Sequence, residues 1–208
     1  MGEDAKRPQP EELERVGDDP LALILGRRSV GRVRPDAIPA AAVAELLEAA
    51  VAAPNHHLTE PWRFVVLGGD ARRAVGEAHA RAMARGRPEL PKAGLAKEAA
   101  RLERAPVVVA CAVHPSAGDP VTRREDRDAV AAAVENLLLA AHARGLGAMW
   151  RTGAMADEPE VRAALGLEEG DEIVAFVYLG RPDDTPPAAA RSRGGLGDVV
   201  TWRGLGPP

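Results

Sequence analysis

One stretch of the chain is apolar at nearly every position, and it limits the folds that the chain can adopt. Residues 106–113 read PVVVACAV. A strand with one face in water alternates apolar and polar residues, whereas a strand covered on both faces does not. Residues 106–113 are therefore predicted to be a buried strand. RFVVLGG (63–69) predicts another buried strand that ends at glycines, and EIVAFVYLG (172–180) predicts a third.

Helices are predicted to outnumber these strands. The longest covers residues 126–144, and it is apolar enough to lie at the centre of the fold. A second begins at Ile38-Pro39 and carries one apolar stripe up to Val51. The shorter predicted helices cover residues 20–27, 70–85, 95–104 and 158–165. Because helices and strands do not alternate regularly, the pattern favours an α+β fold over a doubly wound parallel sheet.

The length of 208 residues suits one sizeable domain. Residues 1–19 are charged and lack a persistent apolar face, which predicts a mobile N-terminal arm before a single domain at 20–208. The polar, arginine-rich stretch 84–105 is predicted to lie on the surface as a flap. The tail from residue 181 is rich in proline, glycine and arginine, so it needs another surface to lie on.

Charge and composition exclude several classes of partner. A net charge of −4 gives no electrostatic case for binding nucleic acid or an anionic membrane. The sequence has no apolar run of the ~18 residues that a membrane span needs and no signal peptide, so a cytoplasmic protein is expected. The single cysteine, Cys111, lies among apolar residues and is predicted to be a buried core thiol.

Several common catalytic and cofactor motifs are absent from the sequence. It contains no G-x-G-x-x-G after a strand, no P-loop and no G-x-S-x-G. The five histidines lack paired metal-ligand spacing. His56 and His57 are adjacent, and in an extended chain they would point apart, which argues against a shared metal.

Arginines beside turns remain as candidates, and each group has two open interpretations. GRRSVGR (26–32) could bind a phosphate or an oxygen-bearing ring, or its arginines could satisfy the carbonyl groups at a helix C-terminus. MWRTGAM (149–155) ends in a loop where glycine allows close approach of a ligand, or it is a capped turn with a packed tryptophan. ARSRGG (190–195) offers two further arginines, or is a solvated part of the tail.

Four motifs, in this order along the chain, carry a resemblance to a known family. They are RRS near residue 28, A-P-N-H-x(4)-P-W-R-F near 60, G-L-G-x-x-W-R-T-G near 150 and EIVAFVYLGRP near 176. The set resembles the nitroreductase-like FMN-dependent flavoproteins, closest to the subgroup with A-P-[DN]-H-x(4)-P-W and W-R-[ST]-G motifs. The resemblance extends over residues 20 to 203.

The resemblance implies an architecture and an activity. Proteins of this family are intertwined homodimers of an α+β fold, with a central antiparallel or mixed sheet flanked by helices and FMN in two clefts at the subunit interface. NADH or NADPH reduces the flavin, and hydride passes through flavin N5 in a ping-pong reaction to a nitroaromatic, quinone or similar electrophilic acceptor. Two alternatives stay open, namely a flavin-binding or carrier protein without turnover and a dedicated flavin-dependent biosynthetic dehydrogenase.

The resemblance also carries residue roles. The RRS residues would meet the flavin phosphate and ring edge, the W-R-T-G residues would come from the other chain, and two arginines of the C-terminal tail, which would cross to the partner subunit, would hold the phosphate. His56 would face the flavin, whereas Trp62 is interpreted as core and His57 as surface. The residues expected to bind the cofactor are Arg27, Arg28, Ser29, His56, Trp150, Arg151, Thr152, Gly153, Arg191 and Arg193.

Overall fold

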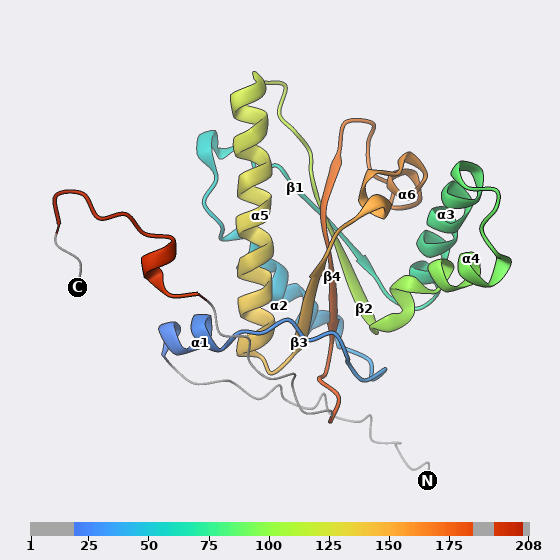
Figure 1. The fold of residues 1–208 in the computed structure, drawn as a ribbon, viewed down its shortest axis with the longest axis horizontal. Coiled ribbons are helices and arrows are strands. Elements are labelled where there is room, and N and C mark those ends of the chain that lie inside the picture. The colour runs from blue at the N-terminus through green and yellow to red at the C-terminus, as the bar shows by residue number, and fades with distance from the viewer. Residues whose placement is uncertain (1–18, 185–193, 206–208) are drawn as a thin grey trace, which may run out of the picture.

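The chain folds around a four-stranded antiparallel sheet with the strand order β1-β2-β4-β3 (Figure 1). The computed structural model describes residues 19–184 and 194–205. The strands are β1 (Trp62–Leu67), β2 (Val107–Val113), β3 (Gly147–Arg151) and β4 (Glu172–Gly180). The α+β prediction is confirmed, and all three strands predicted as such are present.

β2 occupies an inner position of the sheet, and this position explains its composition. It pairs with β1 on one side and with β4 on the other, where Val107 lies opposite Leu179. All seven of its residues are buried, as the uninterrupted apolar sequence predicted. Cys111 is among them, and burial raises the pKa of its thiol to about 12, which keeps it protonated at neutral pH.

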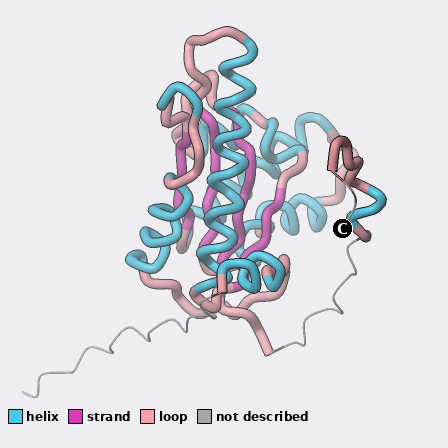
Figure 2. The backbone as a smooth tube through the Cα atoms, turned by 90° about the vertical axis from the view of Figure 1, so that its left-hand side faces the viewer, coloured by secondary structure: helices cyan, strands magenta, loops and turns pink. Residues whose placement is uncertain are grey.

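Helices cover both faces of the sheet (Figure 2). On one face lie α5 (Pro120–Ala143) and α2 (Ala40–Val51), which pack against alternate residues of β2. On the other face lie α3 (Asp70–Gly86), α4 (Lys92–Ala99) and α6 (Pro159–Ala164). Four short 3-10 segments occur in other parts of the described chain, namely η1 (His56–Leu58), η2 (Arg101–Arg104), η3 (Ala154–Asp157) and η4 (Leu196–Asp198). Each face of the sheet therefore has its own apolar core.

Among the described residues, six of the ten exposed large apolar side chains lie in two segments. The first is α1 (Pro20–Gly26), which has no buried residue although its sequence is PLALILG. The second is the C-terminal segment 194–205, which extends away from the sheet (Figure 1). The exposed large apolar residues of these segments are Leu21, Ile24, Leu25, Val199, Trp202 and Leu205. No helix within the described ranges has both the length and the apolar character needed to cross a membrane.

The helix boundaries differ from the predictions in two places. α5 begins at Pro120 and not at 126, because the Asp119 side chain accepts hydrogen bonds from the amides of Val121 and Thr122 and Pro120 takes the first helical position. The charged first turns of α5 hid this start, since they lack an apolar stripe. The helix predicted at 95–104 is instead α4 (Lys92–Ala99) followed by the 3-10 turn η2.

The stretch 84–105 is only partly the surface flap that its polarity predicted. Most of α4 is exposed, but Ala99 at its end is buried beside α3, and Leu102 and Ala105 are buried in the apolar core on this face of the sheet. α4 lies so close to α3 that a Cβ atom added to Gly76 would overlap the backbone carbonyl of Ala99. The stretch 84–105 is therefore held against α3 at the point where α4 ends.

Substituting Gly76 with alanine is expected to destabilise the protein. The added methyl group has no room beside the rigid backbone of Ala99, so the free energy of unfolding in urea should fall by about 1–3 kcal/mol. Gly94→Ala in exposed α4 is the matched control, because nothing lies within 4 Å of an added Cβ there. That control should raise stability by about 0.5–1 kcal/mol through helix propensity. Equal effects of the two substitutions would contradict the close packing of α3 on α4.

Candidate functional site

A cavity of about 250 Å³ opens beside β3, the strand at one edge of the sheet. Three of its lining residues, Trp150, Arg151 and Thr152, belong to the W-R-T-G motif. The remaining lining residues come from η2, β3, η3 and β4, and they are Arg101, Met149, Met155, Phe176 and Tyr178. Four predicted site residues thus fall at or next to one cavity, since Gly153 follows Thr152 directly.

Side chains along β3 alternate between the two faces of the sheet, so neighbouring residues of this strand contact different cores. Met149 packs against the core on the α3 side, and Trp150 packs against the core on the α5 side. Arg151 returns to the α3 side, where its guanidinium lies 5.5 Å from the ring centre of Tyr178. Trp150 thus has the packing that the alternative interpretation gave it, but it also lines the cavity, so its role in binding a cofactor stays a prediction. Arg151 is the charged group that β3 presents to the cavity.

Positive charge surrounds Tyr178 in the cavity wall. Burial raises the pKa of Tyr178, while the nearby guanidinium groups of Arg101 and Arg151 act in the opposite direction. Arg101 also pairs with Glu98 at 2.9 Å, so one of these charges is partly neutralised. An aromatic ring with two arginines beside it suits a planar ligand that carries oxygen atoms or negative charge.

Gly153 has a backbone conformation that requires glycine. Its φ is +113°, and no atom lies within 4 Å of a Cβ added at this position. The space beside Gly153 could hold a side chain, so the backbone conformation, and not close packing, accounts for the glycine. A ligand can therefore approach the Gly153 peptide closely.

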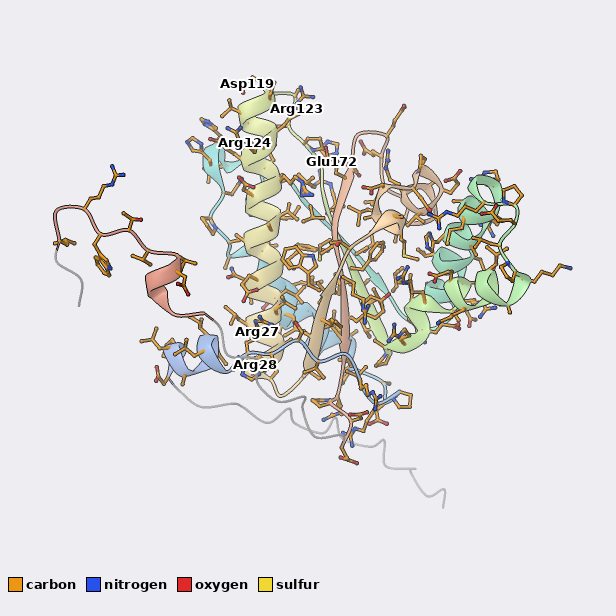
Figure 3. All side chains as sticks on the ribbon, viewed as in Figure 1. Arg27, Arg28, Asp119, Arg123, Arg124 and Glu172 are labelled. Carbon is orange, nitrogen blue, oxygen red and sulfur yellow. The ribbon has the colours of Figure 1, made fainter. Side chains whose placement is uncertain are left out.

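The RRS turn, residues 27–29, lies between the C-terminal end of α5 and β3. Figure 3 labels Arg27 and Arg28 near that end of the helix. Burial is the main cause that lowers the pKa of His142, and the positive charges of Arg27 and Arg28 lower it further. The amide of Val30, directly after Ser29, donates a hydrogen bond to the Ala148 carbonyl of β3 at 2.9 Å. The chain itself therefore brings the RRS turn to the strand that carries W-R-T-G, although the two sets were expected to meet from different chains.

Both arginines of the turn have partners within the chain. Arg28 donates to the carbonyls of Leu25 and Arg27 at 2.9 and 3.0 Å, which is the capping role that the alternative interpretation assigned to it. Arg27 pairs with Glu135 of α5 at 3.2 Å. A guanidinium group has five N–H donors, so these contacts leave donors free for a ligand.

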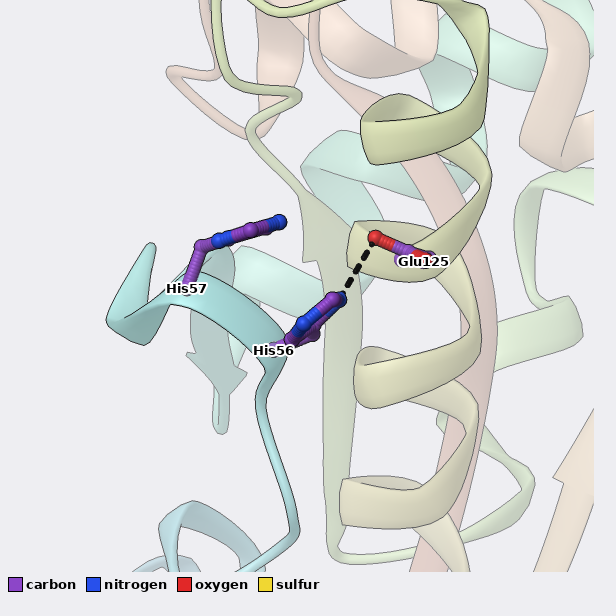
Figure 4. A group of neighbouring side chains, drawn as sticks. All are labelled: His56, His57 and Glu125. Carbon is purple, nitrogen blue, oxygen red and sulfur yellow. Dashed lines mark hydrogen bonds and ion pairs between the residues drawn. The ribbon is translucent and has the colours of Figure 1, made fainter.

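The histidine turn, residues 54–61, lies at the other end of α5. His56 Nδ1 and Glu125 Oε2 are 3.0 Å apart (Figure 4). Thr59 Oγ1 donates a hydrogen bond to Asp126 Oδ1. Glu125 precedes Glu135, the partner of Arg27, by ten residues, which is about 15 Å along a helix. Within one chain, His56 and the RRS turn are thus not brought together.

The two histidines of this turn do not point apart, and that prediction is wrong. Their rings stack with centroids 3.8 Å apart and an interplanar angle of 25°. The prediction assumed extended chain, but His57, Leu58 and Glu60 all have positive φ. Asn55 stabilises this conformation, because its side chain accepts from the Glu60 amide and donates to Thr59 Oγ1.

Other predictions about this region and the tail have different outcomes. Trp62 begins β1 and packs against the core, as predicted, and His57 is exposed. Arg191 and Arg193 lie outside the described residues, so their role at a phosphate stays a prediction. Sequence reasoning missed Glu125 and Asp126. Glu125 precedes the predicted helix at 126–144, and although Asp126 begins that helix, nothing in the sequence indicates its contact with residue 59.

Comparison with known proteins places the chain in a family. A sequence model of the Nitroreductase family matches residues 24–181. The chain belongs to the nitroreductase family. The protein named "Putative NAD(P)H nitroreductase YdjA" from Escherichia coli (strain K12) is 35% identical over 167 residues, which cover 79% of this chain and 88% of that protein.

Solved structures agree with this membership. The nitroreductase-like family protein from Bacillus cereus has a TM-score of 0.78 at 24% identity, over 92% of this chain and all of that one. A "putative nitroreductase" from Desulfovibrio desulfuricans, crystallised in complex with FMN, has a TM-score of 0.67 at 27% identity, over 91% of this chain and all of that one. The nitroreductase fold predicted from the four motifs is therefore confirmed.

Asp126 fixes the histidine turn to α5, and its charge is expected to contribute to stability. Burial alone would raise the pKa of this carboxyl, but hydrogen bonds from Thr59 and Ser116 outweigh burial and hold the pKa below its ordinary value. The stabilisation is therefore present above the ordinary pKa of about 4 and is lost as the pH falls through the folded-state value.

Asp126→Asn should lower the free energy of unfolding by about 1.5–3 kcal/mol at pH 7, because an amide group replaces an acceptor oxygen. Below pH 4 the difference from the wild type should shrink. Urea titrations at several pH values measure both effects. Asp128→Asn, at an exposed position of α5, is the control and should change stability little. A difference that does not depend on pH would contradict the role of the charge.

Proposed function

We propose that this protein is an FMN-dependent NAD(P)H oxidoreductase that reduces nitroaromatic, quinone or similar electrophilic acceptors. The observation that carries the proposal is the hydrogen bond between Val30 and Ala148, which joins the RRS turn to the strand lining the cavity. Family membership supports it, as do the NAD(P)H in the name of the Escherichia coli relative and the FMN in the Desulfovibrio structure.

The residues at the cavity fit a flavin in their chemistry. The open peptide at Gly153 allows a flat ring to approach the backbone, and its N–H is our candidate donor to flavin N5. Arg151 and Thr152 offer hydrogen-bond donors for ring oxygens. The free N–H groups of Arg27 and Arg28, with the Ser29 hydroxyl, would hold the phosphate.

FMN, when bound, supplies the hydride chemistry, accepting from NAD(P)H and giving to the acceptor in two half-reactions. The residues of this chain then have binding and positioning roles. Arg101 and Arg151 would favour a ring edge that gains negative charge, because both lie in a partly enclosed wall beside Tyr178. No side chain at the cavity is assigned as a general acid or base.

We further propose that the protein is a homodimer in which each flavin site contains the RRS turn and β3 of one chain and the histidine turn of the other. The separation of about 15 Å between their anchors on α5 supports this division, since one chain alone does not bring them together. The exposed apolar side chains of α1 and of segment 194–205 offer surface for a second copy to cover.

The first test examines the cofactor and the reaction. The purified protein should be yellow and should release FMN on denaturation. Steady-state oxidation of NADH or NADPH with a panel of quinones and nitroaromatics should give parallel double-reciprocal lines, because donor and acceptor use one site in succession. A protein that cannot be loaded with FMN would end the proposal. FMN binding without turnover would instead favour a flavin carrier.

The second test examines the phosphate site and the sharing of sites. Arg28→Ala should weaken FMN binding about ten- to a hundredfold, because a charge-assisted contact is lost. Arg34→Ala is the control, since Arg34 pairs with exposed Asp36. FMN affinity is measured by fluorescence titration. Equal affinity in the two variants would mean that Arg28 only caps α1.

Heterodimers made from differently tagged chains test the division between subunits. Pairing an Arg28→Ala chain with a His56→Trp chain should restore up to half of the wild-type activity, because one site is then intact. Pairing Arg28→Ala with Gly153→Trp should restore none, because each site then keeps one damaged element. Recovery in the second pair alone would show that W-R-T-G comes from the opposite chain. A monomer by light scattering would refute sharing altogether.

A further inference from the structure

We propose that His56, His57 and Glu125 form a binding site for a divalent transition-metal ion of the zinc class. Each residue offers one ligand atom, and these atoms all lie within 4.8 Å of one another. Figure 4 shows both imidazole rings directed from the turn toward the Glu125 carboxylate on α5. This inference goes beyond the proposed oxidoreductase activity, and it gives His56 a second role in the turn that is proposed above to complete the flavin site of the partner chain.

The ligand types match the chemistry of zinc. Zn²⁺ binds imidazole nitrogen and carboxylate oxygen at about 2.0–2.2 Å, and sites with three protein ligands keep a fourth position for water. Tetrahedral ligands at that distance are roughly 3.4 Å apart. His56 Nδ1 and Glu125 Oε2 are already 3.0 Å apart. The ligand set can therefore close around an ion by rotation of exposed side chains, without movement of α5.

The backbone that presents the histidines is unusual, and the chain stabilises it. Three non-glycine residues in four positions, His57, Leu58 and Glu60, adopt positive φ. Such backbone is unfavourable for residues with side chains and persists only where surrounding contacts hold it. The contacts here are the Asn55 side chain and the bond from Thr59 to buried Asp126. Their combined effect is to keep adjacent histidines on the same side of the chain.

The local charge also favours a cation at this position. His57 interacts electrostatically with the carboxylates of Asp119 and Asp126, in addition to its proximity to Glu125. Arg123 lies near Asp119 and offsets part of this negative charge. Imidazole and carboxylate groups so close together supply the ligand types of a zinc site from one turn and one helix.

Zinc titration of the purified protein, after dialysis against EDTA, tests the site. Isothermal calorimetry with Zn²⁺ should show one ion bound per chain. His57→Asn and Glu125→Gln should each weaken that binding about tenfold or more. Asparagine tolerates the positive φ of residue 57, and Glu125 lies on a helix surface, so both variants should keep the fold, as circular dichroism can verify.

His114→Asn is the matched control, because His114 is also a partly exposed histidine beside a carboxylate, Asp171, at 2.7 Å. Its zinc affinity should equal that of the wild type. X-ray absorption at the zinc edge should find two imidazole ligands in the wild type and one in His57→Asn. Absence of binding, equal affinity in all variants, or zinc without paired imidazoles would each overturn the proposal.

Discussion

The packing of α5 against one face of the sheet determines the positions of the candidate site segments. The helix buries its apolar side against β2 and β4, and three of its polar side chains contact neighbouring segments of the chain. Asp126 bonds to the histidine turn, Asn136 donates to the Ala49 carbonyl of α2, and Glu135 pairs with Arg27. A shift of α5 would therefore move the histidine turn, α2 and the RRS turn together.

The parts of the fold that depend on burial could be predicted from the sequence. A strand apolar on both faces, such as 106–113, has to lie inside, and the apolar stripe of α2 identifies its buried side. The first turns of α5 were missed because Asp119 and Pro120 mark a start whose following residues are charged. There, capping and not periodicity defines the helix, so a search for apolar repeats alone did not find it.

The site was predictable in its residues but less so in its arrangement. The motifs identified β3 and the RRS turn, and the structure joins them through Val30 and Ala148. Arg101 and Tyr178 could not be assigned to the same cavity from sequence, because they reach it from segments that are far apart in the chain. The stacking of His56 and His57 depends on backbone with positive φ, which the residue types at 57, 58 and 60 do not favour.

The strand order has a consequence for how the chain folds during synthesis. β1 and β2 are neighbours in sequence order and in the sheet, but β4, which covers the other edge of β2, is made only after α5 and β3. Until then, the emerging chain carries an apolar strand with unpaired backbone groups along one edge. α5 can cover one face of β2 as soon as it leaves the ribosome, whereas the edge stays open to other chains. Docking of β4 pairs these backbone groups and so removes an edge to which other chains could add.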